Sequence, residues 1–378
     1  MRNKIISKGE LAPWVNELAK KGNLIGVREK GFGPPAGEAG KYEFAPIESA
    51  EELRLDYDVA VTSPKKFFQP SKETLLTFKR GGDFKLNAVV EAESLVIFGI
   101  HPYDAKALSQ MDKVFADDNR DSNYWEKRGK AVIVGIDPAC ASKWSFWDAM
   151  GAATVDKGFD LWLTDLGDRY FIEVGTGKGE KLLKHATTSE ATEADVSARN
   201  DARSKLATLC AGDRKIKAEL KDLPDIFEAA YDNEIWEKRA EKCYSCGSCN
   251  LVCPTCYCFD VREEIDLDLV NGRRVRLWDG CLLESFAAVG HGENFRGERS
   301  ERFRHRLMRK FVYMPKKLSE RGSGFASRSE RGSGGRSEAA ERVVPPDTIN
   351  IACVGCGRCS SVCLPDITDP VKVINELK

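Results

Sequence analysis

Apolar runs in the first half of the chain predict a sheet of buried strands. Residues 94–100 (SLVIFGI) and 130–136 (KAVIVGI) are short and almost continuously apolar, which is typical of strands covered on both faces. Residues 160–174 (DLWLTDLGDRYFIEV) predict two further strands, joined by a turn at residues 166–168.

Helical spacing of apolar residues appears beside these strands and again after them. Leu108, Met111 and Phe115 share one helical face directly after the first apolar run. Strands that alternate with helices indicate a mixed α/β region, in which helices cover a sheet. Residues 188–242 are helical in pattern and charged. This stretch contains an apolar stripe made of Phe227, Tyr231 and Ile235.

A later stretch lacks apolar residues almost completely. SERGSG occurs at 319–324 and again at 329–334, in a region rich in serine, glycine and arginine. Such a composition cannot bury enough surface to fold by itself. We therefore predict a flexible insert at about 318–345, whose closure entropy grows only slowly with its length.

Composition indicates a soluble globular protein with two domains. Hydrophobic residues make up 42% of the 378 residues, charged residues 31%, and the net charge is −1. The first residues lack the apolar segment of a signal peptide, and no apolar run is long enough to span a membrane. We therefore expect a cytoplasmic protein.

Cysteine usage divides the chain. Only Cys140 and Cys210, of 13 cysteines, precede residue 235. We predict an α+β protein with a mixed α/β domain at 1–235, helical in its C-terminal part, and a helical, ferredoxin-like dicluster domain at 236–378. Clustered thiols in the cytoplasm indicate metal ligands or redox groups, because disulfides are disfavoured there.

Two cysteine runs share the spacing C-x2-C-x2-C-x3-C, which is the signature of bacterial ferredoxins. Three closely spaced thiolates can hold three corners of an iron–sulfur cube, and the fourth ligand comes from the other run. Glycines beside the ligands (Gly247, Gly355 and Gly357) allow tight turns around the sulfurs. The predicted ligands of cluster 1 are Cys243, Cys246, Cys249 and Cys363, and those of cluster 2 are Cys353, Cys356, Cys359 and Cys253.

Structural zinc is the alternative for these cysteines, but zinc sites use paired knuckles separated by longer loops. Motifs for catalysis are missing, including the phosphate-binding loop and the H-E-x-x-H zinc motif. The four histidines are scattered along the chain: His101, His185, His291 and His305. We therefore predict no catalytic residues and an electron-transfer role.

Several segments together resemble a known family. They are SPKKFFQPSKETLLTF, GIHPYDAKAL, GFDLWLTDLGDRYFIEV, CYSCGSCNLVCPTCYC, WDGCL and RFRHRLMRKFVYMP. The chain resembles the beta subunit of soluble sulfhydrogenase-type nickel–iron hydrogenases and is similar to the A subunit of anaerobic sulfite reductase. The resemblance implies an iron–sulfur conduit between a flavin subunit that handles NAD(P)H and a separate catalytic subunit, in an anaerobic setting.

The partners implied by this resemblance are the flavin subunit and the hydrogenase small and large subunits, with ferredoxin as a further carrier. A siroheme sulfite reductase subunit replaces the hydrogenase subunits in the alternative reading, and the sequence does not separate the two. A nucleic-acid enzyme with one structural cluster is a remote alternative, and we expect no nucleic-acid binding because the chain is not basic overall.

The chain also departs from the family pattern. Many relatives carry cysteines where this chain has Tyr103 and Ser145-Phe146-Trp147. The resemblance therefore does not extend an additional N-terminal cluster to this chain.

Three further thiols predict a third [4Fe–4S] cluster. Cys256 and Cys258 are two residues apart, so both would point to one side of an extended strand, and Cys281 follows in WDGCL. The resemblance includes this CYC and WxxC pair. Cys140 is the first candidate for a fourth ligand, with His291 or a carboxylate as the alternative. Free buried thiols are the competing interpretation, and Cys210 is expected to be one.

Residues 296–317 carry nine Lys and Arg against two Glu. This basic segment favours one of two roles. It is either a docking face for an acidic partner, or a solvated helix that compensates the charge of anionic clusters.

Overall fold

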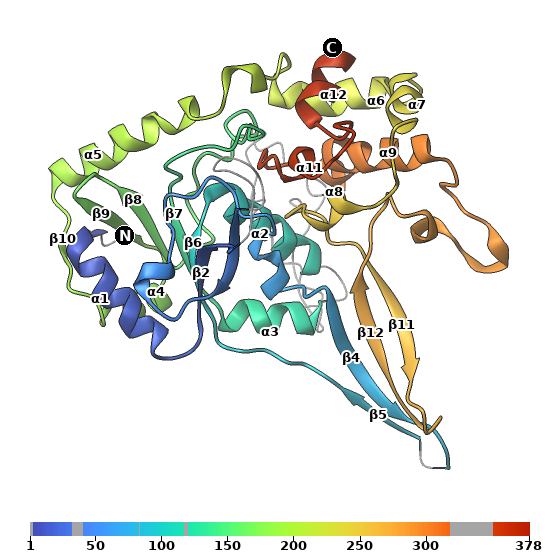
Figure 1. Ribbon diagram of the computed structural model, residues 1–378, viewed down its shortest axis with the longest axis horizontal. Coiled ribbons are helices and arrows are strands. Elements are labelled where there is room, and N and C mark those ends of the chain that lie inside the picture. The colour runs from blue at the N-terminus through green and yellow to red at the C-terminus, as the bar shows by residue number, and fades with distance from the viewer. Residues whose placement is uncertain (1–2, 32–40, 83, 117–119, 318–350) are drawn as a thin grey trace, which may run out of the picture.

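The computed structural model describes residues 3–31, 41–82, 84–116, 120–317 and 351–378 (Figure 1). The predicted insert at 318–345 and its SERGSG repeat lie outside the described residues. Within the described ranges, no helix has the length and apolar character needed to cross a membrane.

An eight-stranded sheet forms the centre of the first part of the chain, in the order β10-β1-β9-β8-β7-β6-β2-β3. Its strands are β1 (Asn3–Ser7), β2 (Leu24–Glu29), β3 (Tyr42–Pro46), β6 (Val96–Ile100), β7 (Val132–Ile136), β8 (Leu161–Asp165), β9 (Arg169–Val174) and β10 (Ser189–Glu190). The four central strands β2, β6, β7 and β8 are parallel, and the outer strands join them in antiparallel pairs. The four strands predicted from the apolar runs and the turn are therefore confirmed.

Helices cover both faces of this sheet. The helices of the chain are α1 (Lys8–Ala19), α2 (Pro102–Phe115), α3 (Ser122–Lys130), α4 (Gly177–Leu183), α5 (Glu193–Ser204), α6 (Leu223–Ala229), α7 (Ile235–Ala240), α8 (Ser248–Leu251), α9 (Arg299–Met308), α11 (Arg358–Ser361) and α12 (Pro370–Leu377). One apolar core lies between the sheet and helices α2 and α3, and a second lies between the opposite face and helices α1 and α4. Leu108, Met111 and Phe115 of α2 are buried in the first of these cores, as their spacing predicts.

The helical stretch before the first cysteine run is interrupted. Phe227 in α6 and Ile235 in α7 are buried, but Tyr231 lies between the two helices with 42% of its surface exposed. The predicted apolar stripe is therefore wrong at Tyr231, because the helix ends two residues before it.

The C-terminal helices form their own apolar core. Helices α6, α7, α9 and α12 meet around a π-helical segment, η8 (Arg309–Tyr313), which continues α9. The rings of Phe227 and Phe311 stack with their centroids 4.4 Å apart. Phe146 and Met150 from the first part of the chain complete the same core, so the two parts share apolar packing.

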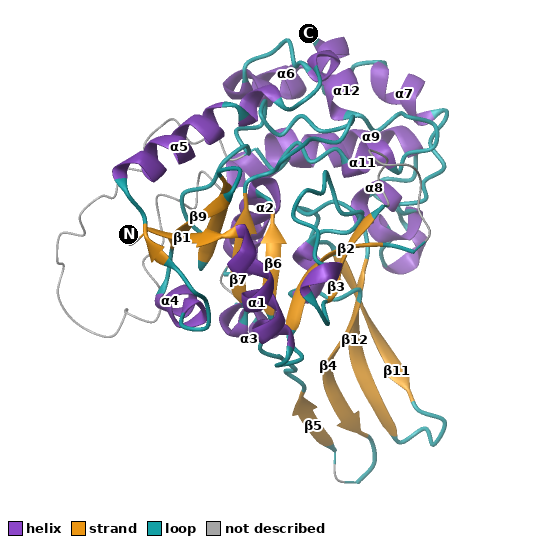
Figure 2. Ribbon diagram, turned by 60° about the vertical axis from the view of Figure 1, so that its left-hand side comes forward, coloured by secondary structure: helices purple, strands orange, loops and turns teal. Residues whose placement is uncertain are grey.

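A second sheet projects from the body of the molecule as an arm (Figures 1 and 2). Its four antiparallel strands run in the order β11-β12-β4-β5 and comprise β4 (Lys72–Lys79), β5 (Lys85–Ala88), β11 (Phe259–Ile265) and β12 (Asn271–Trp278). Strand β4 comes from the first part of the chain and pairs with β12 from the cysteine-rich part. The boundary at residue 235 stays a prediction, and the arm links the chain on either side of it.

Candidate iron–sulfur site

The two cysteine runs fold into equivalent local structures. In each run a glycine in the left-handed region, Gly247 (φ 71°) or Gly357 (φ 77°), precedes a one-turn helix that carries the third cysteine. Helices α8 and α11 contact each other, so the runs lie side by side. The Ser245 amide donates to the Cys243 sulfur over 3.4 Å, and such bonds stabilise thiolate ligands.

Glycine is required in the second run because the backbone presses against residues 144–147. A Cβ atom on Gly355 would lie 2.5 Å from the Cα atom of Trp147, and one on Gly357 would lie 2.5 Å from the carbonyl oxygen of Trp144. The Phe146 amide donates to the Gly355 carbonyl over 2.8 Å. The segment at residues 144–147 therefore serves as packing for the second run.

Four thiols predicted for cluster 2 line one cavity. The cavity is bordered by Cys253 of the first run together with the first three cysteines of the second run: Cys353, Cys356 and Cys359. A cavity that gathers four thiols from both runs has the donor set that a [4Fe–4S] cube needs. The fourth cysteine of the first run therefore lies with the second run.

Three of the four thiols predicted for cluster 1 contact the C-terminal apolar core. Cys243 and Cys249 are buried in the C-terminal apolar core, and Cys363 packs against that core. Burial raises the pKa of Cys249 to about 12, and the thiols of Cys359 and Cys363 add to the rise. Cys246 is exposed, and the hydroxyl of Ser248, 3.4 Å from its sulfur, lowers its pKa.

Buried thiols of this kind are protonated until a metal binds them. Burial raises the pKa of Cys356 to about 12, and it raises the pKa of Cys353 and Cys359 as well. Iron must therefore displace these protons, so cluster binding is coupled to proton release.

Buried cations from the basic segment approach the cysteine loops. Arg306 donates to the carbonyl of Cys249 over 3.3 Å, and Lys310 donates to the Thr255 hydroxyl over 2.7 Å. Burial alone would lower the pKa of Lys310, but the thiolates of Cys253 and Cys256 raise it. Arg302, Arg306 and Lys310 are four residues apart and at most 6% exposed, so this face of the basic segment points inward.

A further buried lysine comes from the first part of the chain. Lys65, in the short helix η2 (Pro64–Phe67), donates to the carbonyls of Cys253 (3.2 Å) and Cys256 (2.9 Å). Its ammonium group lies 4.2 Å from the ring centre of Trp278. Burial lowers the pKa of Lys65 to about 8, and the nearby thiols oppose this shift.

A buried ion pair anchors the second run to the central sheet. Arg358 donates to both carboxylate oxygens of Asp104 in α2, over 2.6 and 2.8 Å, and neither side chain is exposed. It also donates to the Ala60 carbonyl over 2.6 Å. Our sequence reasoning missed Lys65, Asp104 and Arg358, because pairs so distant in the chain leave no local pattern. The four-residue spacing of Arg302, Arg306 and Lys310 was the one feature of the sequence that could have indicated a buried cationic face.

Two of the three additional thiols, Cys256 and Cys281, accept from one amide, and Cys258 lies near Cys281. The Nδ2 group of Asn250 donates to Cys281 over 3.3 Å and to Cys256 over 3.6 Å. Burial, reinforced by Cys281, raises the pKa of Cys258. Cys256 and Cys258 precede strand β11 and do not lie within it, so the strand geometry expected for them is wrong.

Cys140 follows strand β7 and is exposed, with its sulfur 3.4 Å from the Asp56 carbonyl. No contact among the described residues joins it to the thiols around Asn250. Its assignment to a third cluster stays a prediction. Cys210 is half-buried, and burial raises its pKa to about 12. His291, the alternative ligand, has an exposed side chain and a φ of 70°.

No three Cys, His, Asp or Glu side chains in the described ranges converge as ligands of a single metal ion. A four-iron cube holds its thiolates at separate corners, whereas one ion draws them to a common centre. The absence of a single-ion centre among these residues therefore agrees with the proposed cubes, and their ligand sets stay a prediction.

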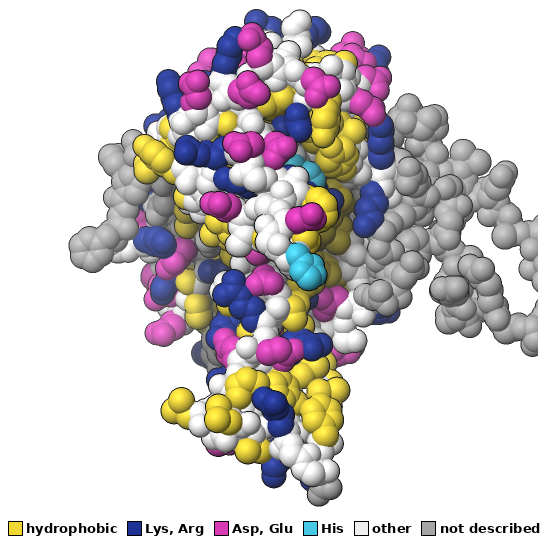
Figure 3. Space-filling model, turned by 90° about the vertical axis from the view of Figure 1, so that its right-hand side faces the viewer, with side chains coloured by type: hydrophobic (Ala, Val, Ile, Leu, Met, Phe, Trp, Pro, Cys, Tyr) yellow, Lys and Arg dark blue, Asp and Glu magenta, His cyan; other side chains and the backbone are white. Residues whose placement is uncertain are grey.

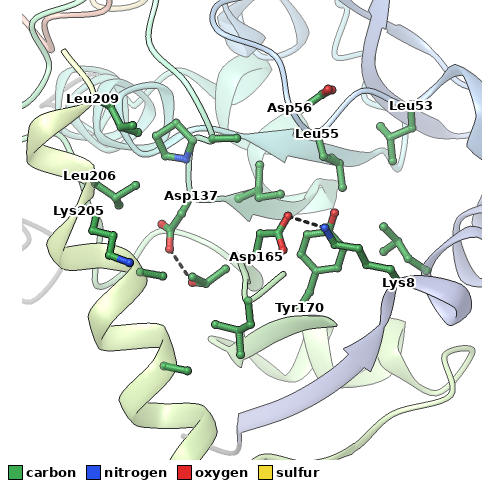
Figure 4. Close-up of a pocket in the computed structure, with 18 of the residues that line it drawn as sticks. Lys8, Leu53, Leu55, Asp56, Asp137, Asp165, Tyr170, Lys205, Leu206 and Leu209 are labelled. Carbon is green, nitrogen blue, oxygen red and sulfur yellow. Dashed lines mark hydrogen bonds and ion pairs between the residues drawn. The ribbon is translucent and has the colours of Figure 1, made fainter. Parts of the chain in front are cut away.

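A separate cleft of about 810 Å³ lies at the carboxyl ends of β7 and β8 (Figure 4). Asp137 and Asp165 follow or end these strands, and Lys8 from α1 forms an ion pair with Asp165 over 2.9 Å. The Asp137 carboxylate accepts hydrogen bonds from Trp162 and Thr164. The lining of this cleft includes none of the cysteines, so it is distinct from the candidate site.

Comparison with known proteins agrees with the geometry of the runs. Residues 242–333 match the family described as 4Fe-4S dicluster domain. The match includes the first run and the thiols around Asn250, and it ends before the second run. The chain is also similar to sulfhydrogenase 2 subunit beta of Pyrococcus furiosus, with 29% identity over 368 residues, which are 96% of this chain and 94% of the relative. No solved structure matches the chain. The resemblance inferred from the motifs is confirmed: this α+β chain is similar to a sulfhydrogenase beta subunit over nearly its whole length, and part of it matches a 4Fe-4S dicluster domain.

Proposed function

We propose that this chain relays single electrons through [4Fe–4S] clusters inside a multi-subunit hydrogenase complex. The dicluster match and the name of the similar protein support an iron–sulfur electron-transfer subunit. The two ends of the proposed relay are a flavin subunit that handles NAD(P)H and the hydrogenase small and large subunits, and electrons pass between them through this chain. The hydrogenase is chosen over a sulfite reductase because the similar protein is named a sulfhydrogenase.

The observation that carries this proposal is the cavity lined by thiols from both runs. Cys253 borders this cavity with Cys353, Cys356 and Cys359, and this arrangement supports an exchange of ligands between the runs. The proposed exchange leaves Cys363 for the first run, and Cys363 packs against the same apolar core as Cys243 and Cys249. Two clusters held in this way lie close together, and each would have all of its irons bound by cysteine. Such clusters supply one-electron transfer and offer no open iron to a substrate.

The protein contributes charge and exclusion of water around the proposed clusters. Arg306, Lys310 and Lys65 place buried positive charge beside thiolates that would otherwise be costly to bury. Positive charge and N–H groups near the sulfurs stabilise the reduced state and so raise the reduction potential. The inward cations of the basic segment thus support its role in charge compensation.

A third cluster is part of the proposal. Cys256, Cys258 and Cys281 would hold it, with Asn250 donating to two of the three thiols. Cys140 stays the first candidate for the fourth ligand. Iron analysis separates the two outcomes: about twelve irons per chain supports three clusters, and about eight with free thiols at these positions rules out the third.

The exchange of ligands is tested with two matched variants. Cys363→Ser should damage the cluster of the first run, and Cys253→Ser should damage that of the second run. Electron paramagnetic resonance of the reduced chain, together with iron content, identifies which signal is lost. If each variant damages the cluster of its own run, the runs close on themselves and the ligand assignment fails. A chain purified without oxygen that contains zinc and no iron would overturn the proposed function.

A further inference from the structure

The cleft at the carboxyl ends of β7 and β8 has the size and position of a small-molecule site (Figure 4). Its volume of about 810 Å³ is typical of ligand pockets, and open α/β sheets bind ligands outside the carboxyl ends of their parallel strands. Helices α1 and α5 form two of its walls. Ala198 and Ala202 line it from α5, and their small side chains leave room for a ligand.

Apolar side chains make up most of the cleft lining. They include Val15 of α1, Ile136 at the end of β7, and Leu206 and Leu209 after α5. No glycine is among the described residues that border the cleft, so it lacks the loop of backbone amides that holds a phosphate group. The lining therefore fits an apolar molecule and not a nucleotide.

The charged groups of the lining are four acids and two bases: Asp56, Asp137, Asp165, Asp201, Lys8 and Lys205. Two of the acids are already paired. Lys8, whose ammonium group lies 5.4 Å from the ring centre of Tyr170, pairs with Asp165 over 2.9 Å. Arg203, which lies outside the lining, pairs with Asp137 over 2.8 Å. These two carboxylates therefore have no free charge to offer a ligand.

The remaining charges leave one carboxylate without compensation. Asp201 in α5 and Lys205 at its C-terminal end are four residues apart, so their charges offset each other on that wall. Asp56 is exposed, and no cation in the described part of the chain forms an ion pair with it. Figure 4 shows Asp56 on the side of the cleft opposite Lys205. The cleft therefore has a free acidic group at one side.

A buried hydroxyl also opens into the cleft. Tyr170 is 8% exposed, and its hydroxyl has no hydrogen-bond partner among the described residues. Its side chain points from β9 toward the middle of the cleft, beside Asp165 (Figure 4). Burial, with Asp165 and Asp56 adding to the effect, raises the pKa of Tyr170 to about 12, so the hydroxyl stays protonated at neutral pH. A buried tyrosine hydroxyl usually has a partner, and here the cleft is where a ligand would supply one.

We infer that this cleft binds a small organic amine, whose apolar body lies on the aliphatic lining and whose ammonium group is held by Asp56 and Tyr170. An ammonium group only donates hydrogen bonds, and a carboxylate and a hydroxyl oxygen both accept them. The inference goes beyond the proposed function, because the cleft borders none of the proposed cluster ligands.

Other classes of ligand fit the lining less well. A metal ion does not fit, because no three acidic side chains in the described ranges converge as its ligands. An anion does not fit either. Lys205 is the one basic group of the described lining without an ion-pair partner, and Asp201 lies one helical turn away from it.

Three probes with the same carbon body separate the effects of the head group. They are hexylamine, 1-hexanol and hexanoate, titrated calorimetrically into the full chain with its metal content unchanged. At neutral pH, hexylamine should bind at one site about tenfold more tightly than 1-hexanol, because only its head group carries a positive charge. Hexanoate should bind more weakly than either, since the Asp56 carboxylate repels it.

Matched variants of the full chain locate the bound head group. Asp56→Asn should weaken hexylamine binding about fivefold and leave 1-hexanol binding unchanged, because it removes one charge at an exposed position. Tyr170→Phe should weaken hexylamine binding about threefold through the loss of one hydrogen bond. The control is Asp225→Asn, an exposed acid in α6 that does not line the cleft, and it should change binding less than about twofold.

A variant of the α5 wall tests the cleft itself. Ala202→Leu fills part of the space, so hexylamine and 1-hexanol should both bind at least about threefold more weakly. Four results would overturn the inference: no hexylamine binding, hexanoate binding as tight as that of hexylamine, unchanged binding in Asp56→Asn or Ala202→Leu, and an equal loss in the control. Each can be measured with the cluster signals present, so it differs from failure of the proposed function.

Discussion

The first and second cysteine runs have the same spacing and opposite surroundings. The second run is enclosed: its glycines touch the backbone of residues 144–147, and its arginine forms a buried pair with Asp104. The first run has an exposed ligand and neighbours that extend into solvent. The motif therefore determines how a cluster is held, and the residues around the motif determine what can approach it.

Breaking the buried ion pair between Arg358 and Asp104 should destabilise the second run far more than the first run. Arg358→Met leaves the Asp104 carboxylate buried without its partner, which should destabilise the protein by about 3–5 kcal/mol and remove the cluster 2 signal first. Chemical denaturation and spin resonance measure these two effects. Lys238→Met, in the exposed pair with Glu234 near the first run, should change stability by less than about 1 kcal/mol.

A variant with both partners replaced sharpens this test. Arg358→Met with Asp104→Leu removes the unpaired charge, so much of the lost stability should return. If the single and double variants are equally unstable, the ion pair is not the reason that the second run depends on α2.

Alanine at equivalent glycines should give the next largest contrast. Gly357→Ala places a methyl group 2.5 Å from the carbonyl oxygen of Trp144, and this backbone cannot move aside, so cluster 2 should be lost or strongly depleted. Gly247→Ala meets only the flexible Leu283 side chain at 2.9 Å. Because the backbone at residue 247 is left-handed (φ 71°), this variant should lose about 1–2 kcal/mol of stability and retain cluster 1. Equal iron loss in the two variants would contradict the difference in packing.

Acid should lower the stability of the protein through the buried side chain of His101. His101 is fully buried beneath Tyr57 and Tyr103, and burial lowers its pKa from 6.5 to about 3. The unfolded chain takes up this proton below pH 6.5 and the folded chain does not. The stability is therefore complete above pH 6.5 and falls by up to about 1.4 kcal/mol per pH unit toward pH 3.

His101→Gln should remove much of this pH dependence between pH 6.5 and 4.5, as measured by denaturation at each pH. His305, near the first run, provides the comparison, because burial lowers its pKa to about 4 but its side chain is only partly buried. The variant His305→Gln should change the pH dependence less. An unchanged slope in His101→Gln would show that other groups control acid stability.

The smallest effect is expected at the exposed ligand. Ser248→Ala removes the hydroxyl that accepts from the Cys246 thiol over 3.4 Å. Once iron binds, this hydroxyl would donate to the thiolate, and loss of that bond would lower the reduction potential of the cluster. Redox titration should show a small negative shift for cluster 1 and none for cluster 2. A shift in both clusters would mean that they are more strongly coupled than their separate surroundings indicate.

Local patterns predicted much of the fold and singled out the cysteines of the proposed ligand sets. Local sequence patterns predicted helix α2 and the strands at 96–100 and 132–136, because an apolar run or a helical period belongs to one continuous segment. The two runs were readable for the same reason, since three of the four ligands in each cluster are close in sequence.

The surroundings of the clusters could not be predicted, because they depend on contacts between distant segments. Lys65 reaches the Cys253 carbonyl, and Arg358 reaches Asp104, without any mark in the sequence around either residue. The exposure of Tyr231 was also missed, since a helical stripe does not indicate where the helix ends. The basic segment was ambiguous because four-residue spacing does not reveal whether its cationic face points inward or outward.

The projecting arm has a consequence for the order in which the molecule is made. Hydrophobic side chains gather on it at the lower end of the molecule (Figure 3), including Leu267 and Leu269 in the turn between its strands. Strand β4 leaves the ribosome early, but its partner β12 is synthesised only after the first cysteine run. A pairing of such high contact order forms slowly, so the β4 edge stays open during most of translation. Insertion of the proposed clusters must wait still longer, because the second run is synthesised after β12. We expect a nascent chain that depends on chaperones until the second run has emerged.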